Sequence, residues 1–422
     1  MKLIGNFFLI LTFFLFVFGC TEKECEECTK EECKDAEKEG NTQETQDNTD
    51  GTETDSATSS RAIQVSLGYN HSCALLEDGR VKCWGYNVDG RLGDGTTSER
   101  NSATQVVGIT DAVQISAGVS HTCAIHFDQT VSCWGQNDEG QLGNGTKIPS
   151  LVPKKVANLN SAKSISSGLD RTCAVTSDRY VYCWGYQRGG PLATSEDPYQ
   201  SLFPNKVNGL SAVSEISVSW SHTCALLENG HVKCWGFNYG SLGDGTTIDR
   251  KEPTEVLNLN NAIAISSGYG YTCSILSDQT AKCWGENDGG HLGNGMSGGE
   301  MLSYDEGIDS LIPTDVLNLN NVVDITTSYH EHTCARLNDS RVKCWGNNTH
   351  AQIGDGTQYG ERVLPTTVLN LRNVTDISAG SLHTCAVTSN GQVMCWGSNG
   401  FGKLGIGTND WSAKEPKMVT GL

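Results

Sequence analysis

The sequence predicts an all-β protein, a seven-bladed β-propeller whose blades are four-stranded antiparallel sheets. The motif Cys-x9-Cys-Trp-Gly occurs seven times. Its copies return about every 50 residues, with one interval near 60, and a fixed period of this length indicates a repeat architecture. Short runs of β-branched and apolar residues alternate with turn residues, without helical periodicity. The repeats cover residues 61–422, which we assign to the propeller.

The repeated motif has the pattern of a β-hairpin. In the first copy, residues 73–85, β-branched and apolar residues flank an Asp-Gly corner, which is typical of a tight turn. A three-residue loop at 77–79 places Cys73 opposite Cys83. Opposed strand positions lie about 4.5–5.5 Å apart at Cα, a separation that a disulfide accepts. We therefore predict seven disulfides: Cys73–Cys83, Cys123–Cys133, Cys173–Cys183, Cys224–Cys234, Cys273–Cys283, Cys334–Cys344 and Cys385–Cys395.

Three further elements complete each unit. In the second unit a strand at 112–118 precedes the hairpin, a glycine loop at 140–146 follows it, and a strand at 153–159 ends the unit. Successive side chains of a strand point to opposite faces, so Trp84 faces away from Cys83. We expect each repeated tryptophan to fill the gap between neighbouring blades.

The repeat resembles that of a known family. The segments G-x-x-H-T-C-A, C-W-G-x-N and G-Q-L-G-D-G-T recur in register, and they resemble the repeat of the regulator of chromosome condensation (RCC1) family. The resemblance covers about residues 61–422 and implies a seven-bladed propeller. The paired cysteines are similar to those of a secreted bacterial lipoprotein branch, which is not nuclear.

The two ends of the repeat region suggest how the ring closes. The first unit lacks the Pro-x-x-Val-x-x-Leu strand that precedes every other hairpin, and the chain ends on such a segment at 416–422. We expect residues 417–421 to pair with the first blade near 62–67. This pairing would leave no open sheet edge along the ring.

The N-terminus is typical of an export signal. An apolar run from Leu3 to Phe18 follows Lys2, and it is too short for a stable membrane span. We assign residues 1–19 to a signal peptide. Gly19-Cys20 resembles the lipobox of bacterial lipoproteins, whose cysteine is acylated, although Phe18 departs from that pattern. We expect an outer-membrane or cell-surface lipoprotein, the alternatives being a periplasmic or secreted protein with an ordinary signal peptide and a chance cysteine.

Residues 20–60 are predicted to be an acidic, disordered tether. Between 21 and 60 there are fourteen acidic residues, four lysines and almost no large apolar side chain, so this segment cannot bury enough surface to fold. Its cysteines could suggest zinc, but a fourth ligand and a scaffold are missing. We therefore expect Cys25, Cys28 and Cys33 to form disulfides within or between tethers, or to stay free thiols.

Charge and cysteine usage limit the partners. The net charge of −19 argues against nucleic acid and anionic lipid head groups, so membrane contact is expected only through the lipid anchor. Strict cysteine pairing indicates an oxidising compartment. We expect a monomer without cofactors that binds an unknown protein or surface ligand.

The repeated polar residues are expected to serve the framework. The histidines of the motif recur with the repeat, so packing and hydrogen bonding are their expected roles: His71, His121, His222, His332 and His383. The loop aspartates Asp94, Asp244 and Asp355 could suggest calcium, but Asp-Gly is first a turn former and one carboxylate falls short of a calcium shell. His330-x-His332 could bind a metal, yet no third ligand is identifiable. No metal site and no catalytic residue are predicted.

Some units depart from the repeat. Unit 3 has Arg171 in the histidine position and loses the glycine loop at 188–198. Unit 5 has Tyr271 there and a long loop at 296–310, and unit 6 has an extra residue within 329–332.

Hairpin register predicts one binding face. The residues just before the first cysteine and just after Trp-Gly lie at the same end of each hairpin, opposite the Asp-Gly corner. Aromatic residues that the repeat does not require occur there, and such residues are typical of interaction surfaces. The alternative is that these rings cap the blade ends and pack on adjacent loops. The predicted face comprises Tyr69, Tyr86, Tyr186, Trp220, Phe237, Tyr269, Tyr329 and His330.

Several classes of function remain open from the sequence. The first is a binding scaffold on the cell envelope. The second is an inhibitor of a secreted enzyme, by fold-level analogy with a propeller-type β-lactamase inhibitory protein. The resemblance also implies guanine-nucleotide exchange, the activity of the founding nuclear member, which export disfavours. A hydrolase or lyase would need a site assembled from several blades.

Overall fold

The computed structural model describes residues 60–186, 200–298 and 309–422. The predicted signal peptide at 1–19 and the tether through residue 59 lie outside the described residues, as does most of each long loop in units 3 and 5. The same holds for four cysteines discussed above: Cys20, Cys25, Cys28 and Cys33.

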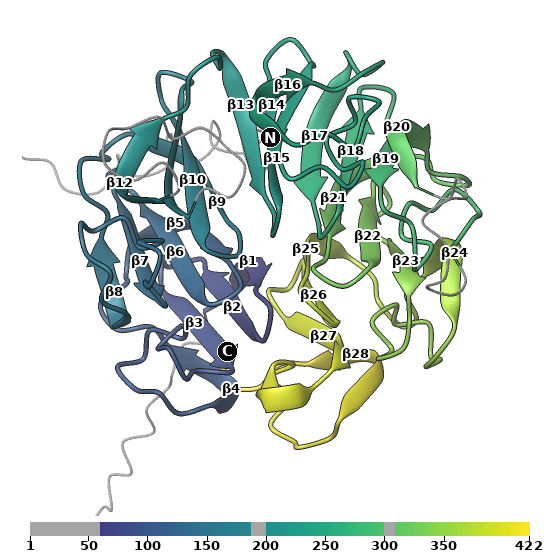
Figure 1. The fold of residues 1–422 in the computed structure, drawn as a ribbon. Coiled ribbons are helices and arrows are strands. Elements are labelled where there is room, and N and C mark those ends of the chain that lie inside the picture. The colour runs from purple at the N-terminus through teal and green to yellow at the C-terminus, as the bar shows by residue number, and fades with distance from the viewer. Residues whose placement is uncertain (1–59, 187–199, 299–308) are drawn as a thin grey trace, which may run out of the picture. The chain divides into compact units, whose positions relative to one another are not determined.

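The predicted seven-bladed propeller is confirmed. Seven four-stranded antiparallel sheets stand around a common centre, with the first strand of each blade innermost and the fourth at the rim (Figure 1). In blade 1 the strands are β1 (Ala62–Leu67), β2 (His71–Leu76), β3 (Val81–Gly85) and β4 (Arg100–Gln105). They pair in chain order.

The other six blades repeat this order. Blade 2 is β5 (Ala112–Ala117), β6 (His121–His126), β7 (Val131–Gly135) and β8 (Ser150–Lys155); blade 3 is β9 (Ala162–Ser167), β10 (Arg171–Thr176), β11 (Val181–Tyr186) and β12 (Gln200–Lys206). Blade 4 is β13 (Val213–Val218), β14 (His222–Leu227), β15 (Val232–Gly236) and β16 (Arg250–Glu255); blade 5 is β17 (Ala262–Ser267), β18 (Tyr271–Leu276), β19 (Ala281–Gly285) and β20 (Ser310–Asp315). Blade 6 is β21 (Val322–Thr327), β22 (His332–Leu337), β23 (Val342–Asn347) and β24 (Glu361–Thr367); blade 7 is β25 (Val374–Ala379), β26 (His383–Thr388), β27 (Val393–Ser398) and β28 (Ser412–Met418).

The hairpin register is the one predicted. Cys73 pairs with Cys83, and the turn glycine Gly79 has φ +81°, a conformation that favours glycine. All seven predicted disulfides are formed. Their Cα atoms lie 4.1 Å apart in every case, closer than the range expected for opposed strand residues.

The hydrophobic core lies at the seams between blades. Trp84 is 0% exposed and packs against Leu404 and the Cys385–Cys395 disulfide of blade 7. Its Nε1 donates to the carbonyl of Lys403 (3.0 Å). Equivalent indole bonds hold five other tryptophans: Trp134, Trp184, Trp284, Trp345 and Trp396. The predicted role of the repeated tryptophan is therefore confirmed.

The motif histidines also bridge the seams. His71 Nε2 lies 2.9 Å from Thr122 Oγ1, and the Thr122 hydroxyl donates to the carbonyl of Arg91 (2.9 Å). The histidine must therefore supply the proton of the first bond, as a neutral ring. Burial lowers the pKa of His71 and lowers that of His121 to about 3. The framework role is confirmed at the equivalent bonds of His121, His222, His332 and His383.

A ring of hydroxyl groups joins the innermost strands. The amide of Ala117 in β5 donates to Ser66 Oγ in β1 (2.9 Å). The same bond recurs at every following seam, where the acceptors are Ser116, Ser166, Ser217, Ser266, Thr326 and Ser378. The last of these closes the ring, because the amide of Leu67 donates to Ser378 Oγ (3.1 Å).

The predicted closure of the ring by residues 417–421 is wrong. The final strand β28 pairs with β27, while β1 pairs with β2, so no blade is shared between the chain ends. The first unit has its own fourth strand, β4, and the final segment serves as the fourth strand of blade 7. The chain end does reach blade 1, but at its rim, where the amide of Ala103 donates to the carbonyl of Thr420 (2.9 Å).

Among the described residues, no helix has the length and apolar character needed to cross a membrane. The one short helix there is a 3-10 turn, η1 (Gly400–Gly402).

If the closing seam is built like the others, Ser378→Ala and Ser66→Ala should cost the same free energy of unfolding. Each removes the acceptor of one buried amide, and the expected loss is about 1 kcal/mol. Urea unfolding of the two variants, with the disulfides intact, makes the comparison. A loss several times larger for Ser378→Ala would show that the hydrogen bond of the closing seam contributes more to the free energy of unfolding than that of the seam between blades 1 and 2.

Candidate functional site

Residues that follow the innermost strands meet at one mouth of the central channel. The rings of Tyr69 in blade 1 and Trp220 in blade 4 have centroids 6.2 Å apart. The hydroxyl of Tyr329 in blade 6 donates to the carbonyl of Ser167 in blade 3 (3.4 Å). Blades 1 and 4, like blades 3 and 6, are not neighbours, so these contacts cross the ring.

We call this cluster the aromatic mouth; it consists of Tyr69, Trp220, Tyr269, Tyr329 and His330. Trp220 and Tyr269 meet edge to face, with centroids 5.8 Å apart, a geometry that aromatic pairs favour. Tyr69 lies against His330 with centroids 5.5 Å apart, and its hydroxyl is 2.9 Å from His330 Nε2. Tyr269 remains 39% exposed, so the cluster presents an accessible surface.

The other three residues of the predicted face lie elsewhere. Tyr86, Tyr186 and Phe237 follow or end third strands, farther from the channel than residues that follow first strands. Tyr86 packs against Phe401 of blade 7 with its ring tilted by 50° (4.7 Å between centroids), and the Arg91 guanidinium lies over the Tyr86 ring at 4.8 Å. The predicted face is thus divided into a central cluster and separate positions on the blades.

The two histidines of His330-x-His332 do not converge. His332 Nε2 lies 2.9 Å from Thr384 Oγ1 in the seam, while His330 Nε2 lies beside Tyr69. Burial lowers the pKa of His330, and Lys403 and His350 lower it further. Within the described ranges, no group of three or more His, Cys, Asp or Glu side chains could hold a metal ion.

The loop aspartates close turns rather than surround an ion. Asp94 Oδ1 accepts hydrogen bonds from the amide and hydroxyl of Thr96, and Asp94 Oδ2 lies 2.8 Å from Arg100. Asp244 pairs with Arg250 in the same way, and Asp355 with Arg362. Each carboxylate is therefore surrounded by donors.

Arg171 lies buried at the seam behind the mouth. The residue is 3% exposed, and its Nε and Nη2 have no hydrogen-bond partner among the described residues. Burial lowers the pKa of Arg171 to about 10, although Asp170 and Tyr329 oppose this shift. Burial raises the pKa of Tyr329, and Arg171 counteracts that effect. The hydroxyl of Thr223, at the position that bonds a motif histidine in other units, also has no partner among the described residues.

Four carboxyl groups border the mouth beside Tyr269. They belong to Glu286, Asp288, Asp309 and Glu331, and the last three act on the protonation of Glu286. Burial, and to a lesser degree the charges of the other three carboxylates, raise the pKa of Glu286 from 4.5 to about 7. Burial also raises the pKa of Tyr269 and of Glu331.

Sequence reasoning did not identify these acids. Their signal was nevertheless present. Glu286 holds the variable position of C-W-G-x-N, which is uncharged in every other unit, and Glu331 belongs to the lengthened segment of unit 6 at 329–332. Their proximity depends on the contact between blades 5 and 6.

Glu286→Gln should stabilise the fold at about pH 8 and do so less at about pH 5. The unfolded chain releases this proton near 4.5 and the folded chain near 7, so stability falls as the pH rises through this window and stays lower above it. Such a shift corresponds to about 3 kcal/mol for a fully desolvated group, which screening at this half-buried site reduces to about 1–2 kcal/mol.

Urea unfolding at both pH values measures this gain. Glu252→Gln, an exposed substitution in β16, is the matched control. Equal gains in the two variants, or a gain that is independent of pH, would contradict the assignment.

Comparisons with known proteins agree with this architecture. Residues 14–305 match the model of the RCC1-like domain. Models of the Regulator of chromosome condensation (RCC1) repeat match residues 322–352, 374–403 and 339–387. The Ultraviolet-B receptor UVR8 of Arabidopsis thaliana is 30% identical over 372 residues, which cover 86% of this chain and 82% of the receptor.

Solved structures show the same fold. Prp20p from Saccharomyces cerevisiae superimposes with a TM-score of 0.71 at 22% identity, covering 82% of this chain and 87% of Prp20p. Yeast RCC1 (Prp20) bound to Kap60 gives 0.68 at 21% identity, with 86% and 85% covered. A family model that spans more than half of the chain and a relative similar over most of both lengths lead to one conclusion: this protein belongs to the family of RCC1-like propellers.

Proposed function

We propose that this protein is an exported lipoprotein of the cell envelope whose propeller binds a partner protein through the aromatic mouth. The observation that carries the proposal is the convergence of Tyr69, Trp220, Tyr269, Tyr329 and His330 across the ring. The repeat does not require these side chains, since other units have Val119, Leu169 or Ser381 at the position that Tyr69 occupies.

The chemistry of the mouth suits a protein partner. Tyrosine and tryptophan offer large apolar contact area together with a polar group, and they are enriched among residues that dominate interface energy. The mouth contacts span blades 1, 3, 4, 5 and 6, so the cluster rests on a rigid ring. Because these side chains are already held in place, binding costs little side-chain entropy, and this favours affinity.

The known structures of similar propellers support a binding role. Prp20p has binding properties to Gsp1p and histones, and yeast RCC1 (Prp20) was solved bound to Kap60. These partners belong to those proteins. What carries over is the use of this fold as a platform for protein recognition.

The sequence features of the N-terminus support the proposed compartment. The apolar run from Leu3 to Phe18 ends at Gly19-Cys20, and a long polar segment follows. The seven disulfides require an oxidising environment to form and persist. An exported protein meets no cytosolic or nuclear GTPase, so nucleotide exchange is not the function we propose. Inhibition of a secreted enzyme would be one form of the binding proposed here.

Trp220→Ala and Tyr269→Ala should leave the fold nearly intact and weaken binding of the natural partner by at least about tenfold. The partner is first captured from envelope extracts with the propeller, residues 61–422, and its affinity for each purified variant is then measured. Phe127→Ala is the matched control, because Phe127 is an aromatic residue of the opposite, Asp-Gly face and is 80% exposed.

Unchanged melting temperatures establish that the mouth variants are folded. Loss of affinity in Phe127→Ala alone would place the binding face at the opposite end of the propeller. Equal affinity of all three variants would refute the role of the mouth.

Cys20→Ser should release the protein from the membrane fraction of the producing cell. Two readouts make the test: incorporation of labelled fatty acid and the partition of the protein between membrane and soluble fractions. We expect the wild-type chain to be labelled and the variant not to be. Labelling that persists in Cys20→Ser, or a soluble wild-type protein, would contradict lipid anchoring at this residue.

A further inference from the structure

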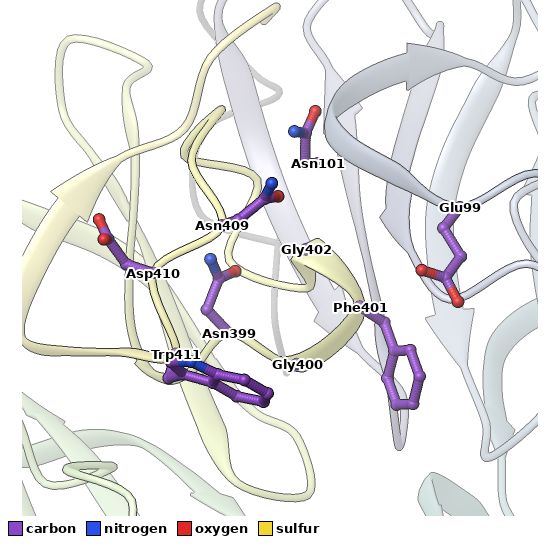
Figure 2. Close-up of a pocket in the computed structure, with 9 residues that line it drawn as sticks. All are labelled: Glu99, Asn101, Asn399, Gly400, Phe401, Gly402, Asn409, Asp410 and Trp411. Atoms are coloured by element: carbon purple, nitrogen blue, oxygen red, sulfur yellow. The ribbon is translucent and has the colours of Figure 1, made fainter.

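A hollow of 460 Å³ lies at the seam between the last and the first blade, apart from the aromatic mouth. Blade 7 supplies the residues around η1 and the loop before β28, and blade 1 supplies Glu99 and Asn101 (Figure 2). Trp411 stands at its edge with 88% of its surface exposed. Its indole ring is therefore accessible to a ligand.

The loop that carries Trp411 departs from the repeat. In blades 1, 4 and 6 an Asp–Arg ion pair closes the corresponding loop. In blade 7, Ile406 replaces the aspartate, and Ala413 replaces the arginine opposite the Trp-Gly glycine. The loop keeps the asparagine bond of the repeat: the Asn399 Nδ2 donates to the carbonyl of Thr408 (3.1 Å), as that of Asn87 does to Thr96, and the Asn399 amide donates to the carbonyl of Trp411 (2.8 Å). The backbone is thus fixed while the indole ring stays exposed.

A second aromatic ring is held in place across the hollow. Phe401 has φ +62°, a left-handed conformation that is strained for a bulky residue. Its ring packs against that of Tyr86 of blade 1 in a tilted arrangement, and the Tyr86 ring in turn lies under the Arg91 guanidinium. Figure 2 shows Phe401 and Trp411 on opposite sides of Gly400, with the amides of Asn399 and Asn409 above Trp411. The two rings therefore form separate platforms rather than a closed cage.

The polar groups that line the hollow indicate which class of ligand it could bind. Its lining holds the carboxylates of Glu99 and Asp410 and the amides of Asn101 and Asn409, and the described residues that line it include no lysine, arginine or histidine. Such a lining disfavours phosphates and acidic sugars. Carboxylate and amide groups hydrogen-bond neighbouring hydroxyls, and an aromatic face packs against C–H groups. An open hollow with both kinds of group suits the ring of a neutral sugar.

We propose that the hollow between blades 7 and 1 binds a neutral glycan of several sugars, with one sugar ring packed on Trp411 and hydroxyls of the neighbouring sugars bonded by Asn101 and Glu99 across the hollow. The site is independent of the aromatic mouth, since none of the mouth residues lines it. A glycan at this position would contact the first and the last blade and would not occupy the central channel.

Tryptophan fluorescence can test this proposal because Trp411 differs from the other tryptophans. The seven repeated tryptophans are 0–2% exposed, and Trp220 belongs to the mouth. Acrylamide quenching of the folded propeller therefore reports mainly on Trp411. The probes are the linear hexasaccharides of glucose, mannose, galactose and N-acetylglucosamine, each titrated to about 10 mM, which detects dissociation constants up to about 1 mM, or about −4 kcal/mol.

At least one neutral hexasaccharide should protect the fluorescence from quenching in a saturable manner. Trp411→Ala should weaken this binding by at least about tenfold, and Asn101→Ala should weaken it by a smaller factor. Trp220→Ala should leave it unchanged. Because Trp411 is almost fully exposed, its variant should keep the wild-type melting temperature.

Three results would overturn the proposal. One is that no neutral hexasaccharide protects the wild-type protein. Another is that Trp411→Ala binds as the wild type does. The third is that tetramethylammonium or a lysine peptide protects Trp411 when the sugars do not, which would make the hollow a cation site.

Discussion

The structure depends on one contact, the seam between neighbouring blades, which is made seven times. At each seam a hydroxyl of one innermost strand accepts the amide of the next, and an indole ring packs on the disulfide of the preceding blade. A single blade cannot bury its own faces, so each depends on both neighbours. The ring leaves no blade without a neighbour, and this is why the last and first blades meet through the same groups as the others. No strand has to be shared between the chain ends.

Because the seams and the disulfide-linked hairpins carry the fold, the short segments that join the strands are free to differ. The aromatic mouth and the seam hollow both arise where units depart from the repeat. Trp220 stands where other units have Val119, Leu169 or Ser381, unit 6 has one extra residue within 329–332, and the loop of Trp411 has no Asp–Arg ion pair. Buried polar groups without partners among the described residues also occur at such a departure, at Arg171 and Thr223. In this protein, irregularity within a regular frame is the best indicator of a site.

Hairpin register predicted part of the arrangement of the aromatic residues. It identified the end of the propeller on which the aromatic residues lie, and Tyr69, Trp220, Tyr269, Tyr329 and His330 do converge there. It could not separate them from Tyr86, Tyr186 and Phe237, because register gives the end of a hairpin but not the distance from the channel. It also missed the carboxyl cluster around Glu286 and the pairing of Trp411 with residues of blade 1. Those groups come from different blades, and spacing along one hairpin contains no information about them.

The sequence alone determined the number of blades, the pairing of all fourteen repeat cysteines and the buried roles of the repeated tryptophans and histidines. These features follow from local period and strand alternation, which act over a few residues. Only the tertiary structure decided how the ring closes, that Tyr69 of blade 1 touches Trp220 of blade 4, and that Glu99 and Trp411 share a hollow. The physical reason is that these contacts join segments from 150 to more than 300 residues apart, whose separation is set by the curvature of the completed ring rather than by any local pattern.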